Sequence, residues 1–128
     1  MVYKHIEVKP IAGACGAEVF GVDLAKPIKR AVFGEIYKAW LKHQVVFFRD
    51  QKITPEQQIK FAKKWGGIHI HPFVKGMAKY PEILEVKKTE KDTYTFGNRW
   101  HTDQMFSPTP AKATMLYAKE TPSFGGDT

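Results

Sequence analysis

The most regular pattern of hydrophobic positions in the chain lies in residues 31–43. Apolar side chains recur there at helical spacing, at Val32, Phe33, Ile36, Tyr37, Trp40 and Leu41. The polar positions Lys38 and Lys42 fall on the opposite side. The pattern predicts an amphipathic helix whose apolar face packs on a sheet.

A second helix is predicted from the residues at its start. Thr54 suits the cap, Pro55 suits the first helical position, and the Gln57 side chain has the spacing to reach back to the cap amide. The helix is expected to end at a glycine pair, Gly66-Gly67, with its inward side carrying Ile59, Ala62 and Trp65.

Alternation of polar and apolar residues predicts the strands. We expect them at residues 3–11, 17–24, 45–48, 82–87 and 113–118. The run Val45-Val46-Phe47-Phe48 is apolar throughout, which is typical of a central strand covered on both faces.

The fold class that follows is mixed α/β. The elements alternate too irregularly for a doubly wound nucleotide-binding sheet, and neither a G-x-G-x-x-G motif nor a P-loop is present. A chain of 128 residues fits one domain, and 43% hydrophobic with 13% aromatic residues excludes disorder as its main state.

The net charge of the chain indicates which kinds of molecule it can bind. Lysines and arginines number 20 against 13 acidic residues, giving a net charge of +7 and a preference for anions. The basic residues are spread thinly along the chain, so we expect small acidic molecules as partners and no nucleic acid.

The remaining composition indicates the compartment. A single cysteine, Cys15, cannot form an internal disulfide and is expected to be a core thiol. The first ten residues lack the apolar run of a signal peptide, and no stretch approaches the length of a membrane span. We therefore expect a soluble, cytoplasmic protein with no membrane partner.

The strongest chemical signal is the pair His101 and Asp103 in the segment W-H-T-D. In an extended strand, residues two apart point to the same side, so an imidazole and a carboxylate would share one face. Such a pair suits a divalent first-row metal, as in the facial triad of non-haem Fe(II) oxygenases. Taken alone, the pair is equally compatible with a surface H-x-D that binds nothing.

A second histidine pair, His69 and His71, lies at strand spacing before Pro72. Histidines of this kind usually make ordinary hydrogen bonds, so the pair alone is weak evidence for a functional site. His5 and His43 have no partner pattern and are expected to be structural or exposed.

The block W-H-T-D-Q-M-F at residues 100–106, together with G-G-D-T at 125–128, resembles the taurine dioxygenase (TauD/TfdA) family of Fe(II)- and 2-oxoglutarate-dependent dioxygenases. The likeness covers the chain in order, including G-V-D-L at 21–24, the segment 43–51 and I-H-I-H-P at 68–72. It implies the N-terminal part of a double-stranded β-helix, or jelly roll, with flanking helices.

The resemblance also implies roles for individual residues. His101 and Asp103 match the first two iron ligands, and Thr128 matches a threonine whose hydroxyl holds a carboxylate of the cosubstrate 2-oxoglutarate. His71 falls where the taurine-specific branch places a histidine on the substrate sulfonate, and a histidinium there would complement an anion. The implied reaction is hydroxylation by O₂ of a small organic acid, with a sulfonate such as taurine as one example.

Two positions depart from the taurine-specific branch. An asparagine that touches substrate is replaced by Gly97, with Asn98 shifted by one place as the candidate substrate contact. An aromatic contact after His71 is replaced by Val74, with Phe73 beside it. These changes argue against taurine as the primary substrate.

The resemblance implies further residues that these 128 do not include. In the family the third metal ligand and the arginine that pairs with 2-oxoglutarate follow the G-G-D-T block, which here ends at Thr128. We therefore expect an N-terminal part of a dioxygenase that is inactive alone, exposes apolar surface, and in its complete form is a homo-oligomer. The alternative is a degenerate, non-catalytic relative that binds metal weakly or serves as an interaction module.

Overall fold

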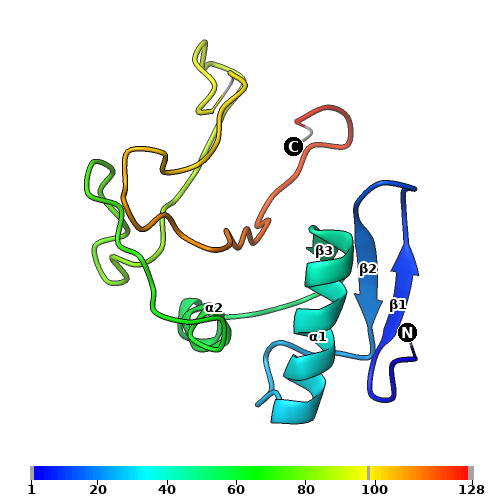
Figure 1. Cartoon of the computed structure of the whole chain (residues 1–128). Coiled ribbons are helices and arrows are strands. Elements are labelled where there is room, and N and C mark those ends of the chain that lie inside the picture. Colours follow the sequence, from blue (N-terminus) through cyan, green and yellow to red (C-terminus); the bar gives the residue numbers. More distant parts are fainter. Residues whose placement is uncertain (1, 98, 127–128) are drawn as a thin grey trace. The chain divides into compact units, whose positions relative to one another are not determined.

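The computed structural model describes residues 2–97 and 99–126 and divides the chain into two compact units, Met1–Leu84 and Glu85–Thr128. The described residues contain three strands and two helices (Figure 1), in the order β1 (Glu7–Pro10), β2 (Ala17–Phe20), α1 (Arg30–His43), β3 (Val46–Phe47) and α2 (Pro55–Ala62). All five elements belong to the first unit, so the predicted mixed α/β class is confirmed there.

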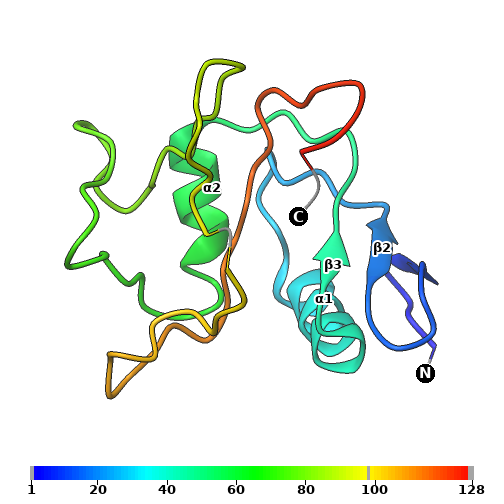
Figure 2. The same cartoon turned by 90° about the horizontal axis from the view of Figure 1, so that it is seen from above.

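The three strands form one sheet in the order β1-β2-β3. Strands β1 and β2 are antiparallel, with Glu7 opposite Phe20 and Pro10 opposite Ala17. Strands β2 and β3 are parallel, with Ala17 opposite Val46. Parallel neighbours need a crossover, and α1 supplies it between β2 and β3 (Figure 2).

The core of the first unit lies between α1 and the sheet. Ile36 and Ala39 of α1 have no exposed surface, and on β2 Ala17 is equally buried while Val19 is 4% exposed. Ala17 and Val19 are two residues apart and so share one face of the strand. The predicted amphipathic helix is therefore confirmed, with its apolar face on the sheet.

The prediction of a central strand at residues 45–48 is wrong in its burial. Only Val46–Phe47 forms a strand, and Val45 and Phe47 remain 45% and 37% exposed. Strand β3 lies at the edge of the sheet and pairs with β2 alone. Phe47 pairs with Glu18, so it and Val45 point to the face of the sheet opposite the one that carries the buried Ala17, which explains why a wholly apolar run is only half covered.

The start of α2 confirms the predicted capping box. The Thr54 hydroxyl accepts a hydrogen bond from the Gln57 amide at 3.3 Å, and the Gln57 side-chain oxygen accepts one from the Thr54 amide at 2.8 Å. Pro55 occupies the first helical position. The helix ends at Ala62, earlier than the predicted glycine pair.

Aromatic rings pack α2 and the residues after it against α1. The Trp65 ring lies edge-on to Phe33 and Trp40, with centroids 5.2 and 5.3 Å away. Phe61 of α2 contacts Phe33 edge-on at 6.3 Å and Phe48 at 6.0 Å. Such edge-to-face contacts fix the rotation of both helices as well as burying apolar area.

Three stretches with strand-like patterns do not form strands. Residues 82–87, 100–103 and 113–118 are irregular, and the described part of the second unit has neither helix nor strand. Alternation suits a pleated surface, but a strand forms only where a neighbouring strand satisfies its backbone groups. In the described residues these stretches have no such neighbour.

Cys15 is exposed, so the prediction of a core thiol is wrong. The residue lies in the connection between β1 and β2, which the Ile11 amide closes by donating to the Gly16 carbonyl at 3.1 Å. His43, by contrast, is buried at the end of α1.

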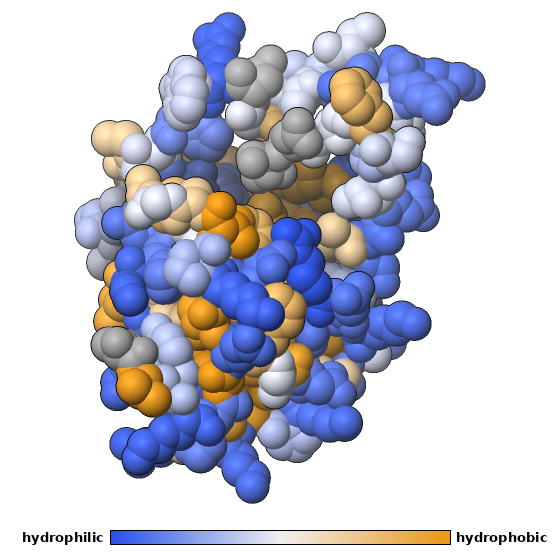
Figure 3. All heavy atoms as spheres, turned by 90° about the vertical axis from the view of Figure 1, so that its right-hand side faces the viewer, coloured by the Kyte–Doolittle hydropathy of each residue, from blue (hydrophilic) through white to orange (hydrophobic). Residues whose placement is uncertain are grey.

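Hydrophilic residues cover much of the face seen in Figure 3, with apolar residues reaching the surface between them. As predicted, large apolar side chains are exposed, and they include Trp100 and Phe124. Leu41 is 60% exposed, so its predicted place on the buried face of α1 is wrong. Among the described residues no helix is both long and apolar enough to cross a membrane.

The Glu35 carboxylate ties the segment before β1 to α1. It accepts backbone hydrogen bonds from Lys4 and His5 at 2.9 Å and from Ile6 at 3.2 Å. Desolvation is the largest single influence and raises the pKa of Glu35, but the three hydrogen bonds and the charge of His5 together outweigh it. The net pKa therefore lies below the ordinary value of 4.5.

We predict that Glu35→Gln lowers the free energy of unfolding at pH 7 and flattens its dependence on pH in the acid range. Because the pKa of Glu35 is lower in the folded state, its stabilisation is present above pH 4.5 and disappears as the pH falls through the folded pKa. Urea unfolding followed by circular dichroism at pH 7 and at several acid pH values measures the difference between the two proteins. It should shrink with falling pH, whereas a constant difference would contradict the assignment. Glu7→Gln is the control, because Glu7 makes only an exposed ion pair with Lys9.

We predict that Thr54→Ala destabilises the protein by about 1 kcal/mol, the usual cost of losing a side-chain cap. Thr54→Ser should keep most of the stability, because its hydroxyl can accept the same hydrogen bond from Gln57. Urea unfolding of the three proteins checks this, and equal loss in both variants would show that the hydroxyl does not act as a cap.

Candidate metal and substrate site

The His101 ring is oriented by the backbone two residues before it. Its Nδ1 lies 2.6 Å from the Arg99 carbonyl oxygen. A carbonyl can only accept, so Nδ1 carries the hydrogen. The other nitrogen, Nε2, then points toward Asp103, whose Oδ1 is 3.1 Å away. The predicted pair therefore does meet, although its segment is irregular and not a strand.

The hydrogen bond to the Arg99 carbonyl is the main reason that the pKa of His101 is raised above its ordinary value of 6.5. Desolvation acts in the opposite direction, and the charge and hydrogen bond of Asp103 add to the increase. A metal ion held here would need Nε2 free of hydrogen, because only a deprotonated nitrogen can be a ligand.

The Asp103 carboxylate is held on its other side by a residue far along the chain. The Thr114 hydroxyl donates to Oδ2 at 3.3 Å, while Oδ1 faces His101. The intervening loop is closed at its base, where the Ala111 amide donates to the Gln104 side-chain oxygen at 2.8 Å. The H-x-D spacing does not predict that the Arg99 carbonyl contacts His101 or that the Thr114 hydroxyl contacts Asp103. The one hint of the second contact in the sequence was a polar threonine within a predicted apolar strand.

His101 and Asp103 fit two neighbouring positions around one metal ion. Bonds of about 2.1 Å that meet at a right angle place their donor atoms about 3 Å apart, close to the separation of Nε2 and Oδ1. The hydrogen on Nδ1 leaves Nε2 as the ligating atom, and the Arg99 carbonyl is the usual kind of outer partner. Residues 2–97 and 99–126 contain no cluster of three or more histidine, cysteine or acidic side chains that could complete a metal site.

His71 contacts the backbone that follows it. Its Nδ1 accepts hydrogen bonds from the amides of Phe73 and Val74, both at 3.1 Å. A nitrogen that accepts carries no hydrogen, so Nδ1 is occupied by these two amides. His71 belongs to the first unit, and His101 and Asp103 belong to the second. The predicted contacts Asn98 and Thr128 lie outside the described residues.

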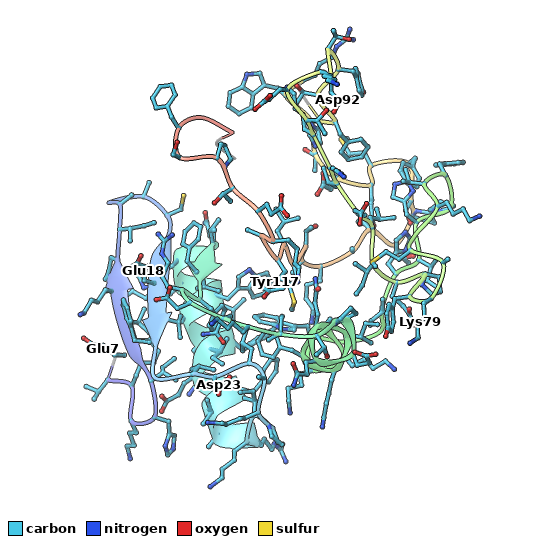
Figure 4. All side chains as sticks on the ribbon, turned by 180° about the vertical axis from the view of Figure 1, so that it is seen from behind. Glu7, Glu18, Asp23, Lys79, Asp92 and Tyr117 are labelled. Carbon is cyan, nitrogen blue, oxygen red and sulfur yellow. The ribbon has the colours of Figure 1, made fainter. Side chains whose placement is uncertain are left out.

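The segment before the site is tied into a tight turn. The Asp92 carboxylate (Figure 4) accepts hydrogen bonds from the amide and the hydroxyl of Thr89, both at 2.6 Å. These bonds hold the pKa of Asp92 below its ordinary value. The Lys88 ammonium donates to the Thr95 hydroxyl across the same turn. Residues 88–95 thus have their own internal hydrogen bonds.

An open depression lies beside His101. It has a volume of about 460 Å³ and is lined by Tyr94, Gly97, Arg99 and His101. A second depression of about 410 Å³ shares three of these residues and adds Trp100. Arg99 thus orients the His101 ring through its carbonyl and also lines the space next to that ring.

Comparison with known proteins shows that the chain is similar to members of one family. The model of the family "Taurine catabolism dioxygenase TauD, TfdA" matches residues 7–128. The chain is 35% identical over 125 residues to an α-ketoglutarate-dependent sulfate ester dioxygenase of Pseudomonas putida, covering 97% of this chain and 40% of that protein. It is 32% identical over 125 residues to an (S)-phenoxypropionate/α-ketoglutarate dioxygenase of Sphingobium herbicidovorans, covering 95% and 43%.

A solved structure of a taurine dioxygenase from Burkholderia xenovorans superimposes with a TM-score of 0.57 and 35% identity, over 61% of this chain and 28% of that one. The chain thus spans about two fifths of the length of these two curated relatives. The family model covers nearly all of the 128 residues, including the W-H-T-D block in which His101 and Asp103 meet. The chain belongs to the TauD/TfdA family of dioxygenases.

Proposed function

We propose that this chain is part of an Fe(II)- and 2-oxoglutarate-dependent dioxygenase that hydroxylates a small organic acid. The observation that carries the proposal is the placement of His101 Nε2 and Asp103 Oδ1 at 3.1 Å, with the ring oriented by the Arg99 carbonyl. Membership of the TauD/TfdA family and the α-ketoglutarate dependence named for both curated relatives support it.

Each candidate residue has one task in this proposal. His101 and Asp103 hold the iron, Thr128 holds a carboxylate of 2-oxoglutarate, and His71 and Asn98 contact the substrate. A further histidine and an arginine would come from residues other than the 128 of this chain. Both units would then belong to a single jelly-roll domain of a cytoplasmic homo-oligomer that binds neither nucleic acid nor membrane.

The chemistry divides between the bound iron and the protein. Iron supplies a redox centre at which O₂ can be reduced, and the net reaction places one oxygen atom in a substrate C–H bond and the other in succinate, with release of CO₂ from 2-oxoglutarate. His101 contributes a neutral nitrogen and Asp103 a negative charge. The Arg99 carbonyl and the Thr114 hydroxyl keep both donor atoms turned to the same point.

The substrate is proposed to be an organic anion other than taurine. The two curated relatives are named for a sulfate ester and for phenoxypropionate, and both of those compounds carry an acidic group. In this chain Gly97 offers no polar side chain to a sulfonate. The net charge of +7 also favours an anion.

A non-catalytic relative is the second candidate. It is favoured by one observation, since the described residues provide two metal-type ligands and no third. Such a protein would bind a divalent metal weakly and would not consume 2-oxoglutarate.

We predict that the complete protein carrying this chain binds Fe(II) and 2-oxoglutarate without O₂ and then shows a visible charge-transfer band. His101→Ala should abolish the band, because Nε2 of His101 is one of the donor atoms. His69→Ala is the matched control and should keep it, since His69 is exposed and its ring contacts His71 at 6.5 Å. A wild-type protein without the band, or an unchanged band in His101→Ala, would refute the proposed function.

We predict that Thr114→Val weakens metal binding about 10- to 100-fold, the usual effect of removing the partner of a ligand. The valine keeps the shape of threonine but cannot donate to Asp103 Oδ2. Thr114→Ser should restore most of the affinity. Titration with Co(II) at constant pH measures all three proteins, and equal affinities for threonine and valine would show that the hydroxyl does not orient the carboxylate.

A further inference from the structure

We propose that Arg99 binds the acidic group of the organic substrate. The inference rests on the proposed function and names the residue that would recognise the anion. Arg99 lies two residues before His101, and it lines the open depression that also contains the His101 ring. An anion held by the guanidinium would therefore lie next to the metal ligand.

The charge of Arg99 is not neutralised within the described residues. The residue is exposed and its guanidinium makes no ion pair there, whereas Arg49 donates to Glu18 at 2.7 Å and lies over the Phe47 ring. The acidic residue that follows Arg99 most closely in the sequence is Asp103, and its two oxygens are engaged by His101 and Thr114. Arg99 thus keeps a full positive charge for a ligand.

The space beside Arg99 suits a small molecule. Gly97 adopts a left-handed φ of +72° and has no side chain, and a Cβ at this position would lie 3.5 Å from Cε1 of His101. The missing side chain leaves open the approach to the ring. The depression is open to solvent, and its volume of about 460 Å³ leaves room for a compact organic molecule.

The chemistry of the lining residues indicates the class of ligand. A guanidinium presents a planar pair of donors that matches two oxygens of a sulfate ester, a sulfonate or a carboxylate. Tyr94 adds an aromatic surface on which the organic part can pack. The Arg99 carbonyl holds the His101 ring at the same time, so one residue sets both the anion position and the ligand orientation.

The test uses the complete protein carrying this chain and the variants Arg99→Gln, Arg99→Lys and Lys91→Gln. Lys91 is the matched control, because its loss removes the same charge from an exposed position that does not line the depression. Substrate-dependent consumption of 2-oxoglutarate gives KM and kcat for an alkyl sulfate, an alkanesulfonate, an aryloxyalkanoate and the neutral methyl ester of that acid. Calorimetric titration of the same anions, with Mn(II) and 2-oxoglutarate in place, gives Kd without turnover.

For Arg99→Gln we expect KM and Kd of the preferred anion to rise roughly 10- to 100-fold, as for loss of a charged hydrogen-bonding partner. The value of kcat, the Michaelis constant for the cosubstrate and all constants for the neutral ester should stay within a few-fold. The KM and Kd of Arg99→Lys should lie between those of wild type and Arg99→Gln, because lysine keeps the positive charge but lacks the paired planar donors of a guanidinium. Lys91→Gln should match wild type. The anion with the largest change identifies the acidic group.

Two results would overturn the inference. One is an unchanged Kd for every anion in Arg99→Gln, and the other is a rise in the Michaelis constant for the cosubstrate in place of that for the substrate. If the wild-type protein still consumes 2-oxoglutarate in either case, the proposed function stands without this role for Arg99. If the wild type binds an anion through Arg99 but never consumes 2-oxoglutarate, the arginine site stands and the proposed function fails.

Discussion

The first unit depends on the backbone at the end of α1, where three elements meet. The His43 carbonyl accepts hydrogen bonds from the amides of Gly16 and Val45 at 2.8 and 2.7 Å, and the Val45 carbonyl accepts one from Ala17 at 3.0 Å. Between them Gln44 adopts a left-handed φ of +66° and still donates to Trp40 at the helix end. The unusual φ turns the chain back beside β2, and this turn sets both the parallel pairing and the position of α1 over the sheet.

Elements that depend on neighbours in sequence could be predicted, while those that depend on distant partners could not. The apolar face of α1 and the capping box of Thr54 and Gln57 follow from contacts within four residues, and both are present. The strand expected at residues 113–118 depends on a second strand to pair with, and the structure leaves it irregular. The half-exposed Phe47 also depends on distant residues, since its sequence neighbours do not reveal that α1 covers only the opposite face of the sheet.

In the candidate site, too, contacts between residues close in sequence could be predicted and contacts between distant residues could not. The spacing of His101 and Asp103 was enough to predict that their side chains lie close together, because two residues span a short distance in any extended chain. The spacing alone does not distinguish a metal site from an ordinary surface pair. Thr114 is 11 residues from Asp103 and reaches it only after the chain reverses, so no local pattern could identify it. The contacts of His71 could not be predicted either, since its ring accepts hydrogen bonds from the backbone amides of Phe73 and Val74.

The hydrogen bond from the Ala111 amide to the Gln104 side chain separates the loop 105–110 from the residues on each side of it. Because the ends of the loop are joined there, changes inside it need not displace Asp103 or Thr114. Substitutions of the two prolines of this loop, Pro108 and Pro110, should therefore leave the contacts among His101, Asp103 and Thr114 in place. The surface of the loop is thus structurally independent of the candidate site beside it.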